Sequence, residues 1–315
     1  MFLSMIVLAA ATSEVRLVMG TRAEVQVGGV EAPAAVIDAA FRALDLVDRS
    51  MSLWKESELT RLNRTGEARV SAELQAVLSH ALEVAEASGG AFDPTVEPLV
   101  RAAGGFGGPK RTLQSAERRR LLGKVGARHV HLDRETGSVK LDPGTALDFG
   151  GIAKGFAVDL AVRALRAAGA RSGLVDLGQS SVSVFGQPLV LEVRNPERPD
   201  GPPWARFRLS EGHVSTSGGD QREDHILDPH TGLPAHHVLS ATVIASTAME
   251  ADALSTAVFV MGADHGLALL ERRGAAGFVL LRRRGRAIVE TTAGLVSSYR
   301  LEPAPGIVIR ERSRP

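Results

Sequence analysis

The chain has 315 residues, which is about two domain lengths at the usual size of roughly 150 residues per domain. Hydrophobic residues make up 44% of it, charged residues 23%, and the formal net charge is +1. This composition argues against a disordered chain and against a nucleic-acid-binding surface. Cysteine is absent, which excludes disulfides, thiolate nucleophiles and thiolate metal sites, so metal chemistry must use oxygen or imidazole ligands.

The first residues, Met1 to Thr12, form an apolar run that ends in small residues. The run has the length of the hydrophobic part of a signal peptide and is too short to span a bilayer, but no positive charge precedes it. It is either an export signal whose start lies upstream or an apolar approach to the first strand. We expect a periplasmic or cell-envelope protein, with a cytoplasmic protein as the alternative.

Alternation of apolar and polar residues predicts two strands over 14–27, which meet at Met19-Gly20-Thr21. Apolar residues at helical spacing predict helices over 33–51, 71–87, 155–168, 248–261 and 264–273. Hairpins are predicted over 128–141 and 278–290, and strands dominate from the third helix to about residue 245. Because helices and strands mix without a regular βαβ repeat, we expect an α+β fold with mixed or antiparallel sheets.

The chain contains no internal repeat and no low-complexity linker. The simplest organisation is therefore one catalytic unit of two lobes over 14–302. The apolar segment 1–13 precedes this unit, and a C-terminal tail, 303–315, follows it.

A glycine-rich loop, Asp148 to Gly155, lies between a predicted strand and a predicted helix. Its glycines let a ligand approach the backbone, the helix N-terminus offers free N–H groups, and Lys154 adds a positive charge, which together suit a phosphate group. Lys154 is one of only five lysines in the chain. The loop is not a Walker A motif, and a plain glycine-rich turn with a surface lysine is the alternative.

Asp252 and Thr256 lie four residues apart at the start of a predicted helix, so both project from one face. A carboxylate and a hydroxyl are hard oxygen ligands that suit Mg²⁺, and the glycine loop is able to add a carbonyl while holding a phosphate. Helix capping by the aspartate and ordinary burial of the threonine are the alternative.

His225 is the histidine that we favour for chemistry. It ends a predicted strand just before a turn, Asp228 to Gly232, whose side chains fix its geometry. A purely structural turn histidine is the alternative. His129 and His131 share a strand face, but no thiolate or third ligand accompanies them, so a zinc pair is the weaker interpretation.

Two further glycine-rich segments, Gly89 to Val96 and Gly104 to Gly108, surround Phe92 and Phe106. They fit either a flat slot for a planar ring or two ordinary loops. The arginines between 282 and 286 lie at a predicted hairpin turn, and we interpret them as solvated rather than as a binding patch.

Taken together, the motifs resemble one family. They are Met19-Gly20-Thr21, Ser57 to Asn63, Gly90 to Val96, Asp148 to Gly155, His225 to Gly232 and Ala251 to Thr256. In this order they closely resemble the ApbE family, the FAD:protein FMN transferases, from about residue 15 to about residue 300. The resemblance implies one two-lobed unit with the FAD site between the lobes.

The resemblance also implies a Mg²⁺-dependent enzyme that attaches FMN from FAD to a threonine or serine hydroxyl of a target flavoprotein and releases AMP. The target would be an FMN-binding-domain protein or a subunit of a sodium-pumping redox enzyme. By motif, Asp252, Thr256 and the Gly151 carbonyl would hold the metal. The catalytic residues would be His225, as the base that takes the hydroxyl proton, and Asp252. The FAD site would be lined by Met19, Ala91, Phe92, Asp93, Asp148, Lys154 and Ile226.

Some positions depart from the family pattern. Gln179-Ser180-Ser181 stands where the family usually has a second glycine and Asn-Ile, and the segment Ser217 to Asp220 carries an extra glycine. The lipoprotein cysteine of many exported members is missing, so no lipid anchor is expected. Two other functions stay open: an FAD pyrophosphatase, in which water replaces the hydroxyl, and a non-catalytic FAD-binding protein.

Overall fold

The structure, a computed structural model, describes residues 3–5, 11–198, 201–218 and 225–313. Its central element is a nine-stranded sheet with the strand order β18-β16-β15-β14-β11-β8-β7-β3-β2. The strands are β2 (Thr12–Val18), β3 (Thr21–Gly28), β7 (Ser172–Leu177), β8 (Ser181–Phe185), β11 (Gly212–Gly218), β14 (Ser240–Ala245), β15 (Ala276–Arg283), β16 (Arg286–Thr291) and β18 (Val308–Glu311). Only the described pair β16 and β18 is parallel; the other neighbours are antiparallel.

A second sheet has the order β1-β9-β10-β17, and two small sheets have the orders β4-β6-β5 and β12-β13. Their strands are β1 (Leu3–Met5), β4 (Glu67–Arg69), β5 (Val130–Asp133), β6 (Ser138–Leu141), β9 (Leu189–Val193), β10 (Ala205–Leu209), β12 (Leu227–Asp228), β13 (Leu233–Pro234) and β17 (Glu302–Pro303). The helices are α1 (Pro33–Met51), α2 (Glu58–Thr65), α3 (Ala72–Ala87), α4 (Glu97–Ala102), α5 (Ser115–Leu122), the 3₁₀ helix η1 (Ala127–His129), α6 (Ala153–Ala167), α7 (Ala248–Arg272) and α8 (Leu295–Tyr299). The predicted α+β class with largely antiparallel sheets is confirmed.

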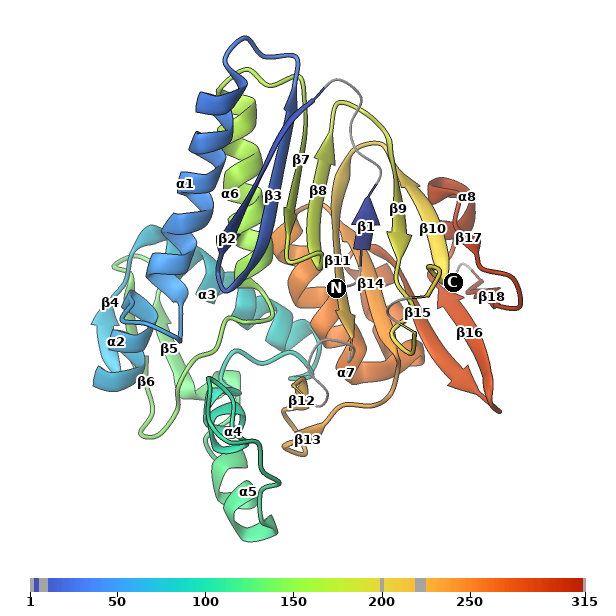
Figure 1. Cartoon of the computed structure of the whole chain (residues 1–315). Coiled ribbons are helices and arrows are strands. Elements are labelled where there is room, and N and C mark those ends of the chain that lie inside the picture. The colour runs from blue at the N-terminus through green and yellow to red at the C-terminus, as the bar shows by residue number, and fades with distance from the viewer. Residues whose placement is uncertain (1–2, 6–10, 199–200, 219–224, 314–315) are drawn as a thin grey trace.

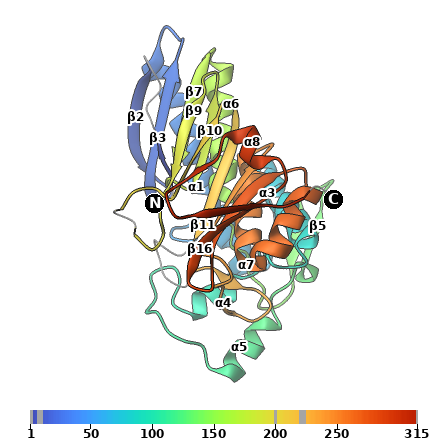
Figure 2. The same cartoon turned by 90° about the vertical axis from the view of Figure 1, so that its right-hand side faces the viewer.

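The large sheet lies between a layer of helices and the second sheet (Figures 1 and 2). On one face it packs against α1, α6 and α7, and alternate residues such as Val25 and Val243 point into the main hydrophobic core there. On the other face, Val214 shares a second core with Phe207 of the neighbouring sheet. Strands with both faces covered carry apolar residues on both sides. This explains the uninterrupted apolar runs within β14 and β15.

The structure agrees with the predicted elements and extends them. The two strands of 14–27, the helix 33–51 and the hairpin 128–141 are all present. Helix α6 starts at Ala153, two residues earlier than predicted, because the Ala153 N–H already donates to the Phe149 carbonyl at 2.8 Å. Residues assigned to the tail form part of β17 and all of β18.

The apolar start of the chain is described only in part, since residues 1–2 and 6–10 lie outside the described ranges. Leu3–Met5 pair with β9, and Thr12 begins β2. The arginine-rich hairpin turn is confirmed between β15 and β16, where Arg282 and Arg283 form ion pairs with Glu197 and Glu290. Paired, exposed arginines at a turn fit the solvated interpretation.

Helix α7 reverses direction at Gly262, which has non-helical backbone angles of φ 79° and ψ −179°. This break matches the two predicted helices 248–261 and 264–273. Arg273 donates to Glu250 at 2.9 Å, although a straight helix would separate residues 23 apart by about 35 Å. The second half therefore folds back beside the first. Among the described residues α7 alone is long and apolar enough to cross a membrane, and since 72% of its most apolar window is buried, its role in the core explains that composition.

Gly155, in the first turn of α6, allows α7 to approach closely. A Cβ on this residue would lie 2.1 Å from the carbonyl oxygen of Ala248 and 2.8 Å from the Cβ of Asp252. The same contact carries a hydrogen bond from the Gly155 N–H to Asp252 Oδ2 at 3.0 Å. The absence of a side chain here sets the distance between the glycine-rich loop and α7.

We predict that Gly155→Ala destabilises the chain by about 1–3 kcal/mol, because backbone and not a flexible side chain stands where the new methyl group must go. Urea unfolding followed by circular dichroism measures this as a lower midpoint with an unchanged slope. The control is Gly123→Ala, at a residue with φ −65° and its nearest neighbour atom at 3.4 Å. Equal midpoints for the two variants would contradict the prediction.

Candidate active site

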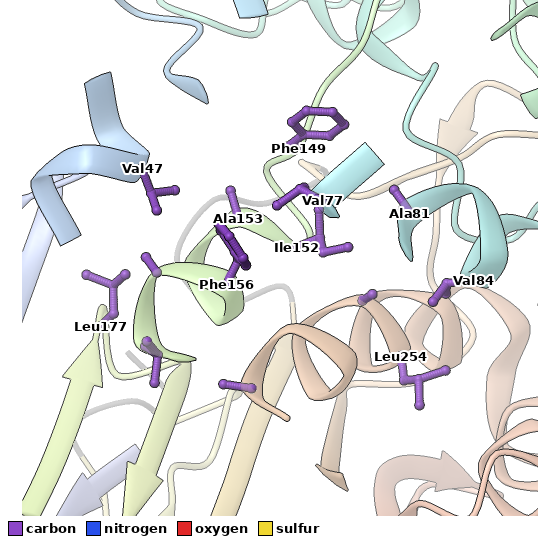
Figure 3. Packing of buried hydrophobic residues seen from close by; sticks show 14 of the residues in the cluster. Val47, Val77, Ala81, Val84, Phe149, Ile152, Ala153, Phe156, Leu177 and Leu254 are labelled. Carbon is purple, nitrogen blue, oxygen red and sulfur yellow. The ribbon is translucent and has the colours of Figure 1, made fainter. Parts of the chain in front are cut away.

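The glycine-rich loop and α7 meet at Gly151 and Thr256. A Cβ on Gly151 would lie 3.0 Å from Thr256 Oγ1 and 3.2 Å from the ring of Phe92. Three segments that are far apart in the sequence therefore converge on one point. The loop is held in place by its apolar neighbours, since Ile152 lies between Val77 of α3 and helix α7, and Phe149 belongs to the same core (Figure 3).

Asp252 lies one turn before Thr256 on α7, and its side chain is buried. Its Oδ2 accepts the Gly155 N–H at 3.0 Å, and its Oδ1 accepts the hydroxyl of Ser215 at 3.1 Å. The ammonium group of Lys154 lies 3.5 Å from Oδ1 and donates to the carbonyl of Gly150 at 3.2 Å. The buried carboxylate is thus neutralised and hydrogen-bonded by groups from α6 and β11.

We call Gly151, Asp252 and Thr256 the oxygen cluster, after the carbonyl, carboxylate and hydroxyl groups that these three residues carry. These are hard donors of the kind that Mg²⁺ prefers. No group of three or more His, Asp or Glu side chains within the described ranges is arranged to hold a metal ion. A single-carboxylate site of this kind therefore needs further oxygens from its ligand, such as those of a phosphate.

His129 and His131 do not share a strand face as predicted, because His129 ends the 3₁₀ helix η1 and only His131 lies on β5. His129 Nδ1 lies 2.9 Å from Asp142 Oδ2, and His131 Nε2 lies 3.0 Å from Asp142 Oδ1. Both rings hydrogen-bond to one carboxylate beside the small sheet of β4, β5 and β6. The hydrogen bonds to Asp142 therefore give the two histidines a structural role beside that sheet.

Asp148 connects the glycine-rich loop to the loop that contains Phe92. Its N–H donates to the Pro94 carbonyl at 2.7 Å, and its Oδ1 accepts the Gly150 N–H at 2.7 Å. Burial raises the pKa of the Asp148 carboxyl, and the hydrogen bond from Gly150 opposes this shift. Asp148 thus fixes both loops through backbone hydrogen bonds.

Ala91, Phe92 and Asp93 are buried in the second loop. Asp93 Oδ1 accepts the Thr95 N–H at 2.8 Å and the Thr95 hydroxyl at 2.5 Å, and burial raises the pKa of its carboxyl. On one side of this loop lies a pocket of about 700 Å³. It is lined by Leu82, Ala85, Glu86, Gly89, Gly90, Asp93, Leu122, Val125, Gly126, Ala127, Arg128, Pro229 and His230. Of the residues predicted for the FAD site, only Asp93 lines this pocket.

The two aromatic residues of the glycine-rich segments have different partners. Phe92 packs near Gly151, whereas Phe106 packs edge-on against Trp54, with ring centres 6.0 Å apart. Trp54 is 61% exposed and was missed by the sequence analysis, although a tryptophan in a polar loop is a usable signal. A single slot between the two predicted aromatics is therefore not the arrangement in the structure.

Met19 occupies the turn between β2 and β3 in the left-handed region, with φ 53°, and packs against the main core. The turn between β7 and β8 adjoins it, because the Gly178 N–H donates to the Arg22 carbonyl at 2.8 Å. There Gln179 also has φ 53°. A glycine adopts this conformation without strain, so glutamine at this position costs about 1–2 kcal/mol of backbone energy.

His225 is exposed and lies before β12, so it does not end a strand as predicted. The strand begins later because the pairing with β13 starts at Leu227. Ile226 is half-buried against the main core. The following turn is rigid as predicted, since the Asp228 side chain accepts hydrogen bonds from the His230 N–H and the Thr231 hydroxyl.

His230 was also missed by the sequence analysis. Its Nε2 lies 2.9 Å from the Gly89 carbonyl oxygen, and its Nδ1 lies 3.1 Å from Asp228 Oδ1. It therefore connects the β12–β13 hairpin to the loop before Ala91. Its place in the turn motif was visible in the sequence, but its partner 141 residues away was not.

Comparison with known proteins identifies the family. A model of the ApbE family matches residues 19–279. The chain is 30% identical over 289 residues to the FAD:protein FMN transferase of Klebsiella pneumoniae, covering 84% of this chain and 82% of that protein. It is 31% identical over 261 residues to the protein of the same name from Haemophilus influenzae, covering 75% of each. The chain belongs to the ApbE family.

Solved structures of this family share its fold. The ApbE protein of Thermotoga maritima superimposes with a TM-score of 0.80 at 29% identity, covering 94% of this chain and 97% of that one. The flavinyl transferase ApbE of Pseudomonas stutzeri gives 0.78 at 27% identity, covering 91% and 96%. Since relatives over most of its length are named transferases, we conclude that this ApbE chain is an enzyme of the transferase class.

Asp176 of this ApbE chain is an unusual buried acid. It lies on β7 with its Oδ1 accepting the Gln179 N–H at 2.8 Å, and Arg22 is 3.5 Å away. Burial raises the pKa of its carboxyl to about 7, and Gln179 and Arg22 only partly oppose this. Between about pH 4 and 7 the folded chain therefore keeps a proton that an unfolded chain, with an ordinary aspartate pKa of about 3.9, releases.

The raised pKa predicts how stability depends on pH. The contribution of Asp176 is complete below about pH 4 and is lost as pH rises to 7, because the unfolded chain then ionises freely and the folded chain does not. The Asp176→Asn variant lacks this loss. The difference in free energy of unfolding, variant minus parent, should therefore increase between pH 4 and 8. A pKa difference of about three sets a ceiling of about 4 kcal/mol on the gain.

Urea unfolding at pH 4, 6 and 8 measures the gain. The control is Asp133→Asn in the exposed β5–β6 turn, where hydrogen bonds from Thr136 and Glu135 lower the pKa of the aspartate. Loss of that side chain should act in the opposite direction, with no further change above about pH 5. An Asp176→Asn difference that stays constant across the three pH values would contradict the prediction.

Proposed function

We propose that this chain is a Mg²⁺-dependent FAD:protein FMN transferase that attaches FMN to a threonine or serine hydroxyl of an acceptor flavoprotein and releases AMP. The acceptor hydroxyl oxygen would bond to the phosphorus of the FMN half as the bond from that phosphorus to the AMP phosphate breaks. Family membership supports the reaction class. The single observation that carries the proposal is the meeting of Gly151, Asp252 and Thr256 beside Lys154.

The oxygen cluster would hold the metal. In this arrangement the Asp252 carboxylate, the Thr256 hydroxyl and the Gly151 carbonyl supply three oxygens, and phosphate oxygens of FAD complete the site. When bound, Mg²⁺ neutralises charge on the phosphates at the reacting centre. The buried carboxylate suits this role because it already accepts fixed hydrogen bonds that hold its plane.

Lys154 would bind a phosphate of FAD. Its ammonium group stands in the first turn of α6, where the positive end of the helix dipole favours an anion. Since it lies 3.5 Å from Asp252, one lysine faces both the metal side and the phosphate side of the site. We propose that the FAD site is otherwise lined by Met19, Ala91, Phe92, Asp93, Asp148 and Ile226.

His225 would take the proton of the acceptor hydroxyl. An exposed imidazole suits this role because a protein substrate must reach it and because a neutral imidazole is able to accept a proton from a hydroxyl group. The turn that follows it is held by hydrogen bonds from His230 and Thr231 to the Asp228 side chain. We further propose an acceptor of the FMN-binding-domain or sodium-pumping redox type, met at the cell envelope.

Incubation with FAD, Mg²⁺ and such an acceptor tests the proposal. The acceptor should gain the mass of FMN less one water, fluoresce in a denaturing gel and appear together with an equal amount of AMP. Asp252→Ala and His225→Ala should each slow labelling by at least about 100-fold, and EDTA should stop it. Matched controls are Asp264→Ala, at an exposed aspartate of α7, and His131→Ala, which should label at the parental rate.

The other outcomes are distinct. AMP and free FMN formed without acceptor would indicate a pyrophosphatase. Tight FAD binding with no AMP at any Mg²⁺ concentration would indicate a binding protein. Either result would overturn the transferase proposal, and full labelling by Asp252→Ala would overturn the metal site.

A further inference from the structure

Alternate side chains of strand β11 face Asp252 and Thr256, the two residues of the oxygen cluster on α7. Ser215 and Ser217 lie two residues apart, so both point to the face of the large sheet that α7 covers. Thr216 points to the opposite face, where its hydroxyl lies 2.9 Å from that of Thr242 on β14. The hydroxyl groups of Ser215 and Ser217 thus lie on the side of the oxygen cluster, and that of Thr216 lies on the opposite side of the sheet.

Ser215 acts on the carboxylate. Its hydroxyl is buried and donates to Asp252 Oδ1 at 3.1 Å, on the oxygen opposite the one that accepts the Gly155 N–H. The Ser181 hydroxyl of the neighbouring strand lies 3.3 Å from Ser215 and is able to donate to it. With one donor on each oxygen, the carboxylate plane is fixed from both sides.

Ser217 contacts the threonine through a network of hydroxyl groups. Ser255 donates to the Asp252 carbonyl at 2.9 Å, and a carbonyl only accepts. The Ser217 hydroxyl lies 2.8 Å from that of Ser255 and 3.3 Å from that of Thr256, and Thr256 also donates to the Asp252 carbonyl at 3.4 Å. Ser217 therefore joins the hydroxyl groups of Ser255 and Thr256 in one network, which restrains the Thr256 side chain from the β11 side.

We propose that Ser215 and Ser217 are positioning residues that preorganise Asp252 and Thr256 for a divalent cation. The inference rests on the proposed function, which makes these two side chains metal ligands. It adds that β11 sets the affinity of the site for the metal without touching the metal. Outer hydroxyl and amide partners of this kind typically change metal affinity by 10- to 100-fold when removed.

Metal binding measured apart from turnover tests this. The Kd of Mn²⁺, followed by electron paramagnetic resonance on the full chain with and without FAD, should rise at least about tenfold in Ser215→Ala and in Ser217→Ala. The Kd of FAD measured in EDTA should stay within about twofold of the parent. In the transferase assay, the Mg²⁺ concentration for half-maximal rate should rise more than kcat falls at saturating Mg²⁺.

Two further variants separate positioning from general damage to the fold. Thr216→Val removes a buried hydroxyl from the same strand on the other face, and it should leave the Mn²⁺ Kd within about twofold. Ser217→Thr keeps the hydroxyl on a half-buried strand residue and should restore most of the affinity lost in Ser217→Ala. Equal weakening by Thr216→Val, or no recovery with Ser217→Thr, would overturn the inference.

The failure of the inference is distinguishable from that of the proposed function. Loss of Mn²⁺ binding in Asp252→Asn, together with parental Kd values in both serine-to-alanine variants, would overturn the inference and leave the proposed function standing. Unchanged Mn²⁺ binding in Asp252→Asn would overturn the proposed metal site, and the inference with it.

Discussion

The geometry of the site depends on one buried anion, the carboxylate of Asp252. A buried carboxylate is stable only when hydrogen-bond donors and positive charge surround it, and here the donors come from α6 and β11 while Lys154 supplies the charge. Removal of a donor or of Lys154 would leave the negative charge of the buried Asp252 carboxylate only partly compensated. The elements that surround α7 are therefore held in one arrangement by electrostatics, in addition to apolar packing.

Steric fit makes this arrangement possible. The buried carboxylate reaches the first turn of α6 only because residue 155 has no side chain, and the glycine loop reaches Thr256 for the same reason at residue 151. Both glycines approach a partner on α7. Their main role is to permit close contact, since neither has a left-handed backbone conformation.

Much of this was predictable from the sequence because the signals are local. Apolar residues at helical spacing indicate α1, α3 and α7, and glycine followed by a helical pattern indicates the loop before α6. Strand β18 was not predicted, because four residues between glycine and proline-containing segments carry little pattern and are ordered by pairing with β16. Ser215 and Ser217 were missed for a related reason: alternating serines resemble any polar strand face until the partner helix is in place.

The reversal of α7 at Gly262 gives the length of that helix a particular importance. The second half returns Arg273 to Glu250, which also lies 2.5 Å from His80 of α3, so the first turn of α7 is attached to a residue that the chain reaches more than twenty positions later. Each residue inserted between the reversal and Arg273 would move the guanidinium by about 1.5 Å along the helix and rotate it by about 100°. This segment therefore tolerates substitutions at its exposed positions but no insertions or deletions, whereas the exposed turn at Arg284-Gly285 tolerates changes of length.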